Sequence, residues 1–111
     1  MLIEITIRNY LLEKIPSVPI EVTEPTDEDK YIVLRIVDRG KQDLINGVTV
    51  EFYSYGPSKL EAARLDEELR TAMEEIVELD SIFSSKLGGG NDDYNDVLDK
   101  YRYRSYFNLT Y

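Results

Sequence analysis

The chain has 111 residues, a formal net charge of −9 and a hydrophobic fraction of 42%, and it contains neither histidine nor cysteine. This length and hydrophobicity predict one domain, residues 1–111, with a single core, while the acidic excess disfavours binding to nucleic-acid phosphates. Without imidazole or thiol, the commonest proton shuttle, the soft metal ligands and the sulfur nucleophile are missing, so we expect neither enzymatic activity nor a cofactor.

The first segment fits two patterns. Residues 2–7 could alternate as a strand, but helical spacing is shown by the apolar residues Ile3, Ile7, Tyr10, Leu11 and Ile15. We predict a short helix that ends before Pro16, because the residue before a proline avoids the α conformation. Glu4 interrupts the apolar N-terminus and no basic run precedes it, so we expect no signal peptide. No apolar run approaches the ~20 residues of a membrane span.

Prolines mark the next segment, residues 16–25, as extended. Ile20 and Val22 alternate with polar residues, which predicts a short edge strand, a place where proline is tolerated. Residues 24–30 are an acidic turn, for which a hard-metal site is the alternative interpretation. Calcium needs oxygen ligands at defined spacing, whereas the acidic residues at positions 27–29 are merely consecutive, so we favour a solvated loop.

Two strands follow and are expected to form a hairpin. Residues 31–37 are dense in β-branched residues and almost continuously apolar, which predicts a central strand covered on both faces. Residues 38–43 are a polar connection. Residues 48–55 alternate between apolar and polar side chains, as in a half-buried strand. The hairpin should therefore have a long, charged tip.

The one unmistakable helix begins at Ser58, directly after a Gly-Pro pair. Ser58 and Glu61 have the spacing of a capping box, in which a hydroxyl and a carboxylate satisfy each other's backbone amides. Asp66 and Arg70 lie four residues apart and can pair. A single apolar stripe, which should pack across one face of the sheet, is formed by Ala62, Leu65, Leu69, Ala72, Met73 and Ile76.

Carboxylates crowd the C-terminal end of this helix, where the helix dipole prefers cations: Glu74, Glu75, Glu78 and Asp80. Each misplaced charge costs roughly a few tenths of a kcal/mol in solvent, so a tolerated acidic surface is the simpler interpretation. The alternative is that a basic patch on a neighbouring subunit faces this end. Neutralising Glu74 and Glu78 should then weaken assembly, and unchanged assembly would dismiss the idea.

Residues 82–87 predict a further strand, and residues 88–91 predict a flexible loop. The three glycines at positions 88–90 lack the Lys-Ser/Thr pair of a phosphate-binding loop, and the aspartates that follow would repel an anion. A calcium loop around Asp93, Asn95 and Asp96 is rejected, because its sixth position is not glycine and the closing glutamate is absent.

The chain ends in a strand that runs to Tyr111. Its aromatic and aliphatic side chains alternate with a more polar set, Arg102, Arg104, Tyr106, Asn108 and Thr110. Basic and aromatic residues interleaved on a strand can stack single-stranded nucleic acid. We favour a core-facing strand, because alternating aromatics are typical of one and the net charge repels polyanions. The whole pattern predicts an α+β fold, a mostly antiparallel sheet of four to five strands with one long helix packed on one face and a short N-terminal helix.

Four stretches in this order carry a family resemblance: Pro16-Ser17-Val18-Pro19-Ile20, Tyr31-Ile32-Val33-Leu34, Phe52-Tyr53-Ser54 with the helix from Ser58 to Leu79, and the closing strand from Tyr103 to Tyr111. From about Asn9 onward, the chain resembles the tail terminator (tail completion) proteins of long-tailed bacteriophages, which are related to minor tail and head–tail joining components. The resemblance is one of element order and apolar rhythm.

The resemblance implies an architectural role in the virion, which is assembled in the host cytoplasm. Such proteins form a hexameric ring that caps the tail tube, halts polymerisation of the major tail protein and offers a surface to the head-completion protein. DNA passes through the lumen without specific binding, and no membrane is involved. The family has no catalytic residues to transfer. Candidate residues of the subunit and tail interface are Asp38, Arg39, Lys41, Asp43, Glu74, Glu78, Arg102 and Arg104.

Two other functions fit the residues. One is a small intracellular adaptor that uses the hairpin at residues 31–37 as a docking edge, and a stable monomer that binds a soluble host protein would favour it. The other is a carboxylate enzyme with a hard metal, built on a pair such as Asp38 and Asp43. Metal-dependent stabilisation in a thermal melt would favour that alternative.

Overall fold

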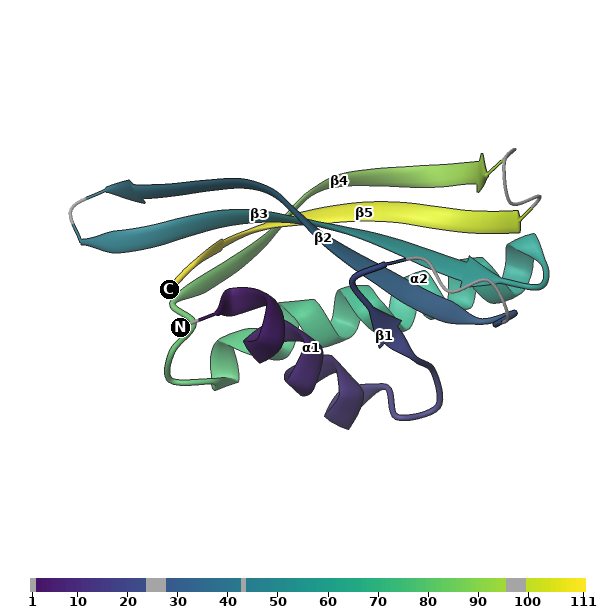
Figure 1. Ribbon diagram of the computed structural model, residues 1–111, viewed down its shortest axis with the longest axis horizontal. Coiled ribbons are helices and arrows are strands. Elements are labelled where there is room, and N and C mark those ends of the chain that lie inside the picture. Colours follow the sequence, from purple (N-terminus) through teal and green to yellow (C-terminus); the bar gives the residue numbers. More distant parts are fainter. Residues whose placement is uncertain (1, 24–27, 43, 96–99) are drawn as a thin grey trace.

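The computed structural model describes residues 2–23, 28–42, 44–95 and 100–111. It confirms the predicted α+β fold: a five-stranded, mostly antiparallel sheet has the order β1-β2-β3-β5-β4, and both helices lie on one face of it (Figure 1). The elements are α1 (Ile3–Lys14), β1 (Ile20–Glu21), β2 (Tyr31–Gln42), β3 (Ile45–Gly56), α2 (Lys59–Glu75), the 3-10 turn η1 (Ile76–Glu78), β4 (Ser84–Asn95) and β5 (Lys100–Thr110).

The core lies between the sheet and the helices. Phe52 of β3 and Phe107 of β5 are fully buried and meet edge to face, with ring centroids 6.1 Å apart. The predicted stripe, from Ala62 of α2 to Ile76 at the start of η1, is buried in this core. The predicted N-terminal helix is confirmed as α1, whose buried residues are Ile3, Ile7, Tyr10 and Leu11. Burial of one such large apolar side chain stabilises the fold by roughly 2 kcal/mol.

The start of α2 follows local sequence rules. The Ser58 side chain accepts a hydrogen bond from the backbone N–H of Glu61 at 3.2 Å, as the predicted N-cap requires. The predicted pair is also present, with Arg70 Nε 2.8 Å from an Asp66 carboxylate oxygen. Asp66 is buried, and this burial raises the pKa of its carboxyl group in spite of the nearby guanidinium.

The hairpin prediction needs two corrections. The central strand of the sheet is β3, whereas β2 lies beside the edge strand β1, which pairs with it only at Ile32 and Val33. Burial on both faces therefore covers only residues 31–34, and Arg35 is exposed. Residues 38–42, predicted as a polar connection, continue β2 after a bulge and pair with β3. Matched cross-strand pairing thus extends both strands to the tip.

The tip of this hairpin projects past the rest of the sheet (Figure 1). β5 pairs with β3 only as far as Gly47, and beyond it Asn46 exchanges two backbone hydrogen bonds with Tyr111. Leu44 turns the chain with a φ of +70°, and its side chain is 85% exposed.

The glycine run is part of a strand, which contradicts the predicted loop at residues 88–91. β4 includes all three glycines and pairs with β5, with a bulge between Leu87 and Gly89. A Cβ at Gly88 would lie 2.4 Å from a ring carbon of Tyr106, so the bare backbone is what lets this ring lie against β4. The glycines therefore serve close packing.

Candidate functional site

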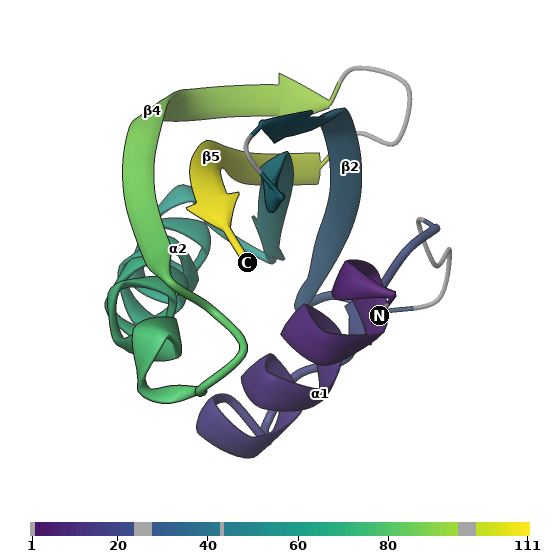
Figure 2. The same ribbon diagram turned by 90° about the vertical axis from the view of Figure 1, so that its left-hand side faces the viewer.

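The sheet has one face against the helices and one face turned away from them. Figure 2 shows both helices below the curved sheet, so that its upper surface lies outside the main core. Part of this surface is itself buried, in a second, smaller cluster of Tyr31, Val33 and Tyr55. We call this surface the basic sheet face. It is defined by the cations that strand register places on it, Arg35, Lys86, Lys100, Arg102 and Arg104.

Glu51 is the centre of an ion cluster on the basic sheet face. Glu51 is 3% exposed, and its carboxylate oxygens lie 2.7 Å from Arg104 Nη2 (Oε2) and 3.2 Å from Arg35 Nη2 (Oε1). Burial acts to raise the pKa of Glu51, but hydrogen bonding by Tyr53 and Arg104, with the two positive charges, outweighs it and holds that pKa below its usual value. Two guanidinium groups share one carboxylate, so the cluster remains positive.

Arginine and tyrosine side chains extend this cluster along β5. The Arg102 guanidinium lies 4.2 Å from the ring centre of Tyr53 and donates a 2.9 Å hydrogen bond to the Tyr55 hydroxyl. Tyr55 stacks on Tyr31, with ring centroids 4.5 Å apart, and Lys100 lies over the Tyr31 ring. Cation–π contacts of this kind hold the charged groups in a fixed arrangement while they remain at the surface.

Replacement of Glu51 by glutamine should reduce the pH dependence of stability. Because the folded pKa of Glu51 is lowered, its contribution to stability is present above the ordinary glutamate pKa and is lost as the pH falls through the folded pKa. At neutral pH we expect Glu51→Gln to cost about 2 kcal/mol, and the difference from the wild type should shrink in acid. Urea unfolding at a series of pH values measures this, and a difference that stays constant would contradict it.

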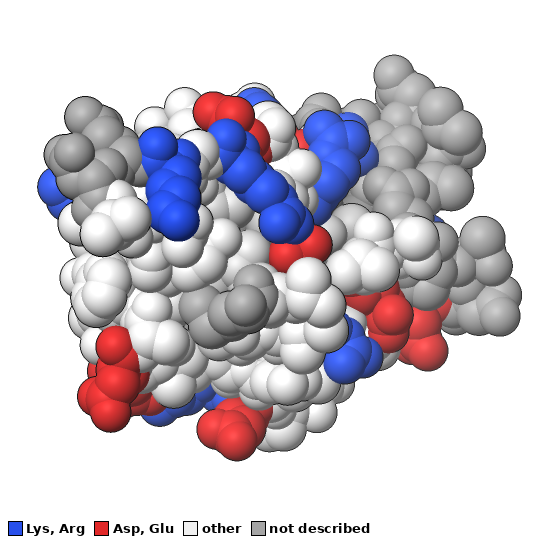
Figure 3. All heavy atoms as spheres, turned by 60° about the vertical axis from the view of Figure 1, so that its left-hand side comes forward, with Lys and Arg blue, Asp and Glu red and all other residues white. Residues whose placement is uncertain are grey.

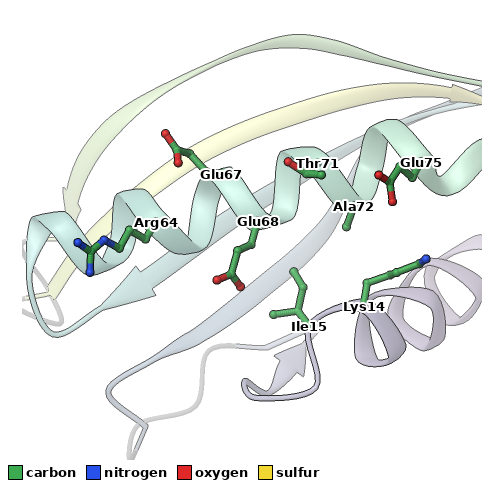
Figure 4. Close-up of a pocket in the computed structure, with 8 residues that line it drawn as sticks. All are labelled: Lys14, Ile15, Arg64, Glu67, Glu68, Thr71, Ala72 and Glu75. Carbon is green, nitrogen blue, oxygen red and sulfur yellow. The ribbon is translucent and has the colours of Figure 1, made fainter.

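The opposite side of the molecule carries an acidic groove. It lies between the C-terminal end of α1 and the outer side of α2, has a volume of about 500 Å³, and has Ile15 and Ala72 as its buried lining residues (Figure 4). Three carboxylates line it, Glu67, Glu68 and Glu75, together with two cations, Lys14 and Arg64. The three carboxylates and Glu74 define what we call the acidic helix face. None of these four forms a salt bridge with another described residue.

The predicted interface residues fall into three separate groups. In the hairpin, Asp38 and Lys41 are exposed, and Arg39 forms a 2.6 Å salt bridge with Glu4 of α1. Asp43 lies outside the described residues, so the pairing of Asp38 with Asp43 does as well. The salt bridge of Arg39 ties the base of the projecting tip to the helix layer.

The acidic end of α2 has a partner within the chain. Glu78 lies 3.0 Å from Lys14 of α1, and the pKa of Glu78 is lowered by this lysine. Burial and the neighbouring Glu78 carboxylate raise the pKa of Tyr10 to about 12. Glu74 is exposed on α2. The contact of α1 with this end of the helix therefore gives the Glu78 carboxylate a partner but gives none to Glu74 among the described residues.

Arg102 and Arg104 lie together on the basic sheet face, as their alternation on one strand predicts. Their partners, Glu51 for Arg104 and Tyr53 for Arg102, were not predicted from the sequence. The sequence signal that could have identified these partners is the alternation that places Thr49, Glu51 and Tyr53 on one face of a strand. It becomes informative only once β3 and β5 are known to be neighbours.

Two further predictions concern metals and membranes. In the part of the chain that the structure describes, no three acidic side chains come close enough together to hold a metal ion. Of the acidic turn at residues 24–30, positions 24–27 lie outside the described residues, as does Asp96 of the rejected calcium loop. Neither length nor hydropathy would allow a helix among the described residues to cross a membrane.

No known family matches the sequence, and no curated protein shows significant similarity to it.

Proposed function

We propose that this chain is a subunit of a bacteriophage tail terminator ring, which caps the tail tube and connects it to the head. The element order that resembles this family is accompanied by a long helix packed on one face of an open sheet and by a projecting hairpin. An open sheet face and a projecting arm are surfaces suited to contact with copies of the chain and with a larger cylinder.

One observation carries this proposal: the residue at the hairpin tip is a leucine. Leu44 adopts the left-handed conformation that glycine or asparagine would accept at lower cost, and its side chain is 85% exposed. Next to it, Ile45 is also exposed, at 45%. Neither strain nor exposed apolar surface stabilises the isolated chain, and both are typical of a contact site. The tip is therefore proposed to dock on the tail tube or on the next subunit.

The assembly is driven by the template. A weak contact between subunits becomes favourable when the end of the tube presents a symmetric row of sites, because the second contact is then intramolecular. The ring is proposed to be hexameric, with the major tail protein on one side and the head-completion protein on the other. The net charge of −9 would let DNA move through the lumen without binding. Lysine substitutions facing the lumen should therefore lower infectivity.

An elongation assay tests the proposed function. Tail tube protein of the source phage is polymerised with and without this chain, and tube lengths are measured by negative-stain microscopy. The proposal expects the chain to stop growth at substoichiometric amounts relative to tube protein. Length distributions that are the same with and without it would contradict the proposal.

The tip leucine should matter for docking and not for folding. Leu44→Asn relieves the left-handed strain, so we expect the free energy of unfolding to stay equal or to rise by up to about 1 kcal/mol. Arrest of tube growth should nevertheless require at least about ten times more protein, as loss of one apolar anchor implies. Leu60→Gln, at a leucine that is 61% exposed on α2, is the matched control and should arrest growth normally. If Leu44→Asn arrests tube growth as well as the wild type does, the tip is not part of the interface.

A sheet edge favours the adaptor alternative. Beyond Val33, β2 has no partner on its outer side among the described residues, and such an edge can accept an extended peptide. A chain that stays monomeric with tail tubes, yet binds a soluble host protein through β2, would favour the adaptor.

A further inference from the structure

The charges of this chain are segregated between its two layers. Together, α2 and η1 carry seven carboxylates and three cations, whereas β5 carries three cations and no carboxylate. Figure 3 shows Lys and Arg side chains mostly along the upper, sheet side of the molecule and Asp and Glu mostly along the lower side. The outward face of the sheet also carries the carboxylates Asp38 and Glu51, so its positive charge is an excess of cations among the described side chains, in a chain whose net charge is −9.

Internal ion pairs do not remove this segregation. On the helix side, Arg70 is engaged by the buried Asp66, and Lys59 by Asp92 of β4. These contacts use two of the three helix cations, and the third, Arg64, lines the groove beside the carboxylates. The four carboxylates of the acidic helix face form no salt bridge with any described residue. On the sheet side, Glu51 neutralises only one of the two arginines that contact it.

Shape as well as charge distinguishes the two faces. The acidic helix face borders the groove of about 500 Å³ between α1 and α2, whose buried apolar lining residues are Ile15 and Ala72 (Figure 4). Lys14 and Arg64 also line this groove, and Lys14 is paired with Glu78. The basic sheet face presents the Arg35 side chain, 64% exposed, and the exposed Lys86. Long cationic side chains can reach into a groove of this kind and lay their apolar stems along its floor.

We infer that copies of this chain associate head to tail, with the basic sheet face of one copy against the acidic helix face of the next. This inference rests on the proposed function, because a ring needs a contact that repeats in one direction. Pairing of identical faces would bring like charges together, whereas contact between different faces neutralises both and closes into a ring if the rotation allows. A nucleic acid also carries the charge that the sheet face attracts, but the net charge of the chain repels it.

Charge reversal tests this arrangement. The sheet variant carries Lys86→Glu and Asn108→Asp, two exposed positions paired across β4 and β5 that do not touch Glu51. The helix variant carries Glu68→Lys and Glu74→Lys. Sedimentation velocity at low ionic strength, over a series of protein concentrations, measures self-association. We expect salt-sensitive association of the wild type and at least about tenfold weaker association of each variant alone.

Two combinations identify the faces that meet. Mixing the sheet and helix variants should restore association, and one chain carrying all four substitutions should associate by itself. A contact between two sheet faces or between two helix faces gives no such recovery in the fourfold variant. That result would overturn the inference, as would a wild type that stays monomeric at every concentration. Urea unfolding of each variant verifies that it is folded.

A labelled single-stranded oligonucleotide tests the competing ligand. Binding that is lost in the sheet variant and kept in the helix variant, without self-association of the wild type, would overturn the inference in favour of a nucleic-acid surface. The elongation assay separates this inference from the proposed function. Arrest of tube growth that is insensitive to every charge reversal would overturn the head-to-tail contact and leave the terminator role in place. Charge-dependent self-association without arrest of tube growth would overturn the terminator role and leave the head-to-tail contact in place.

Discussion

Replacing Phe52 with alanine is expected to lower the free energy of unfolding by about 4 kcal/mol, a large part of the stability of a domain of this size. Phe52 is fully buried on β3, the central strand, and packs edge to face on Phe107 at 6.1 Å. The substitution removes a ring from the core and leaves a cavity, since the surrounding strands and α2 can close only in part.

Urea unfolding followed by circular dichroism measures this loss. Phe83→Ala is the matched control, because it removes the same side chain where the ring is 65% exposed, and it should cost less than about 1 kcal/mol. Equal losses at the two positions would mean that the core is not centred on the contact between β3 and β5.

Replacing Gly90 with alanine is expected to cost about 3 kcal/mol. A Cβ at this position would lie 2.4 Å from the backbone oxygen of Arg104 and 2.7 Å from a guanidinium nitrogen of Arg70. The first contact is with backbone of the neighbouring strand, so β4 must move away from β5. The second contact disturbs the salt bridge of the buried Asp66.

Gly40→Ala is the control for this effect. No atom lies within 4 Å of a Cβ built at Gly40, which is also in a strand, so this substitution should change the free energy of unfolding by less than about 1 kcal/mol. If residues 88–91 were a flexible loop, Gly90→Ala would cost as little stability as Gly40→Ala. The difference between the two variants therefore tests whether the glycine run is strand.

Local patterns were sufficient to predict the helices. The stripe and the N-cap of α2 depend on residues three and four positions apart, and a proline marks the end of α1. Alternation likewise identified the existence of the strands. These signals need no knowledge of distant residues, and the structure confirms them.

Pairing between distant segments could not be predicted in this way. The contact of Arg104 with Glu51 joins residues 53 positions apart and depends on β5 lying beside β3. The glycine run looked like a loop because its partner, Tyr106, lies on another strand. The length of the hairpin was underestimated because charged residues continue a strand when the opposite strand supplies matched backbone partners, as at Gly40 and Gly47.

The proposed terminator role is tested most directly by cryo-electron microscopy of tail tubes, from the phage proposed as the source of this chain, after incubation with it. We expect a closed ring of subunits at one end of each tube, with the β2–β3 tip on the tube or on the next subunit and each sheet face against a neighbouring helix face. Bare tube ends, with the chain left free in solution, would contradict it.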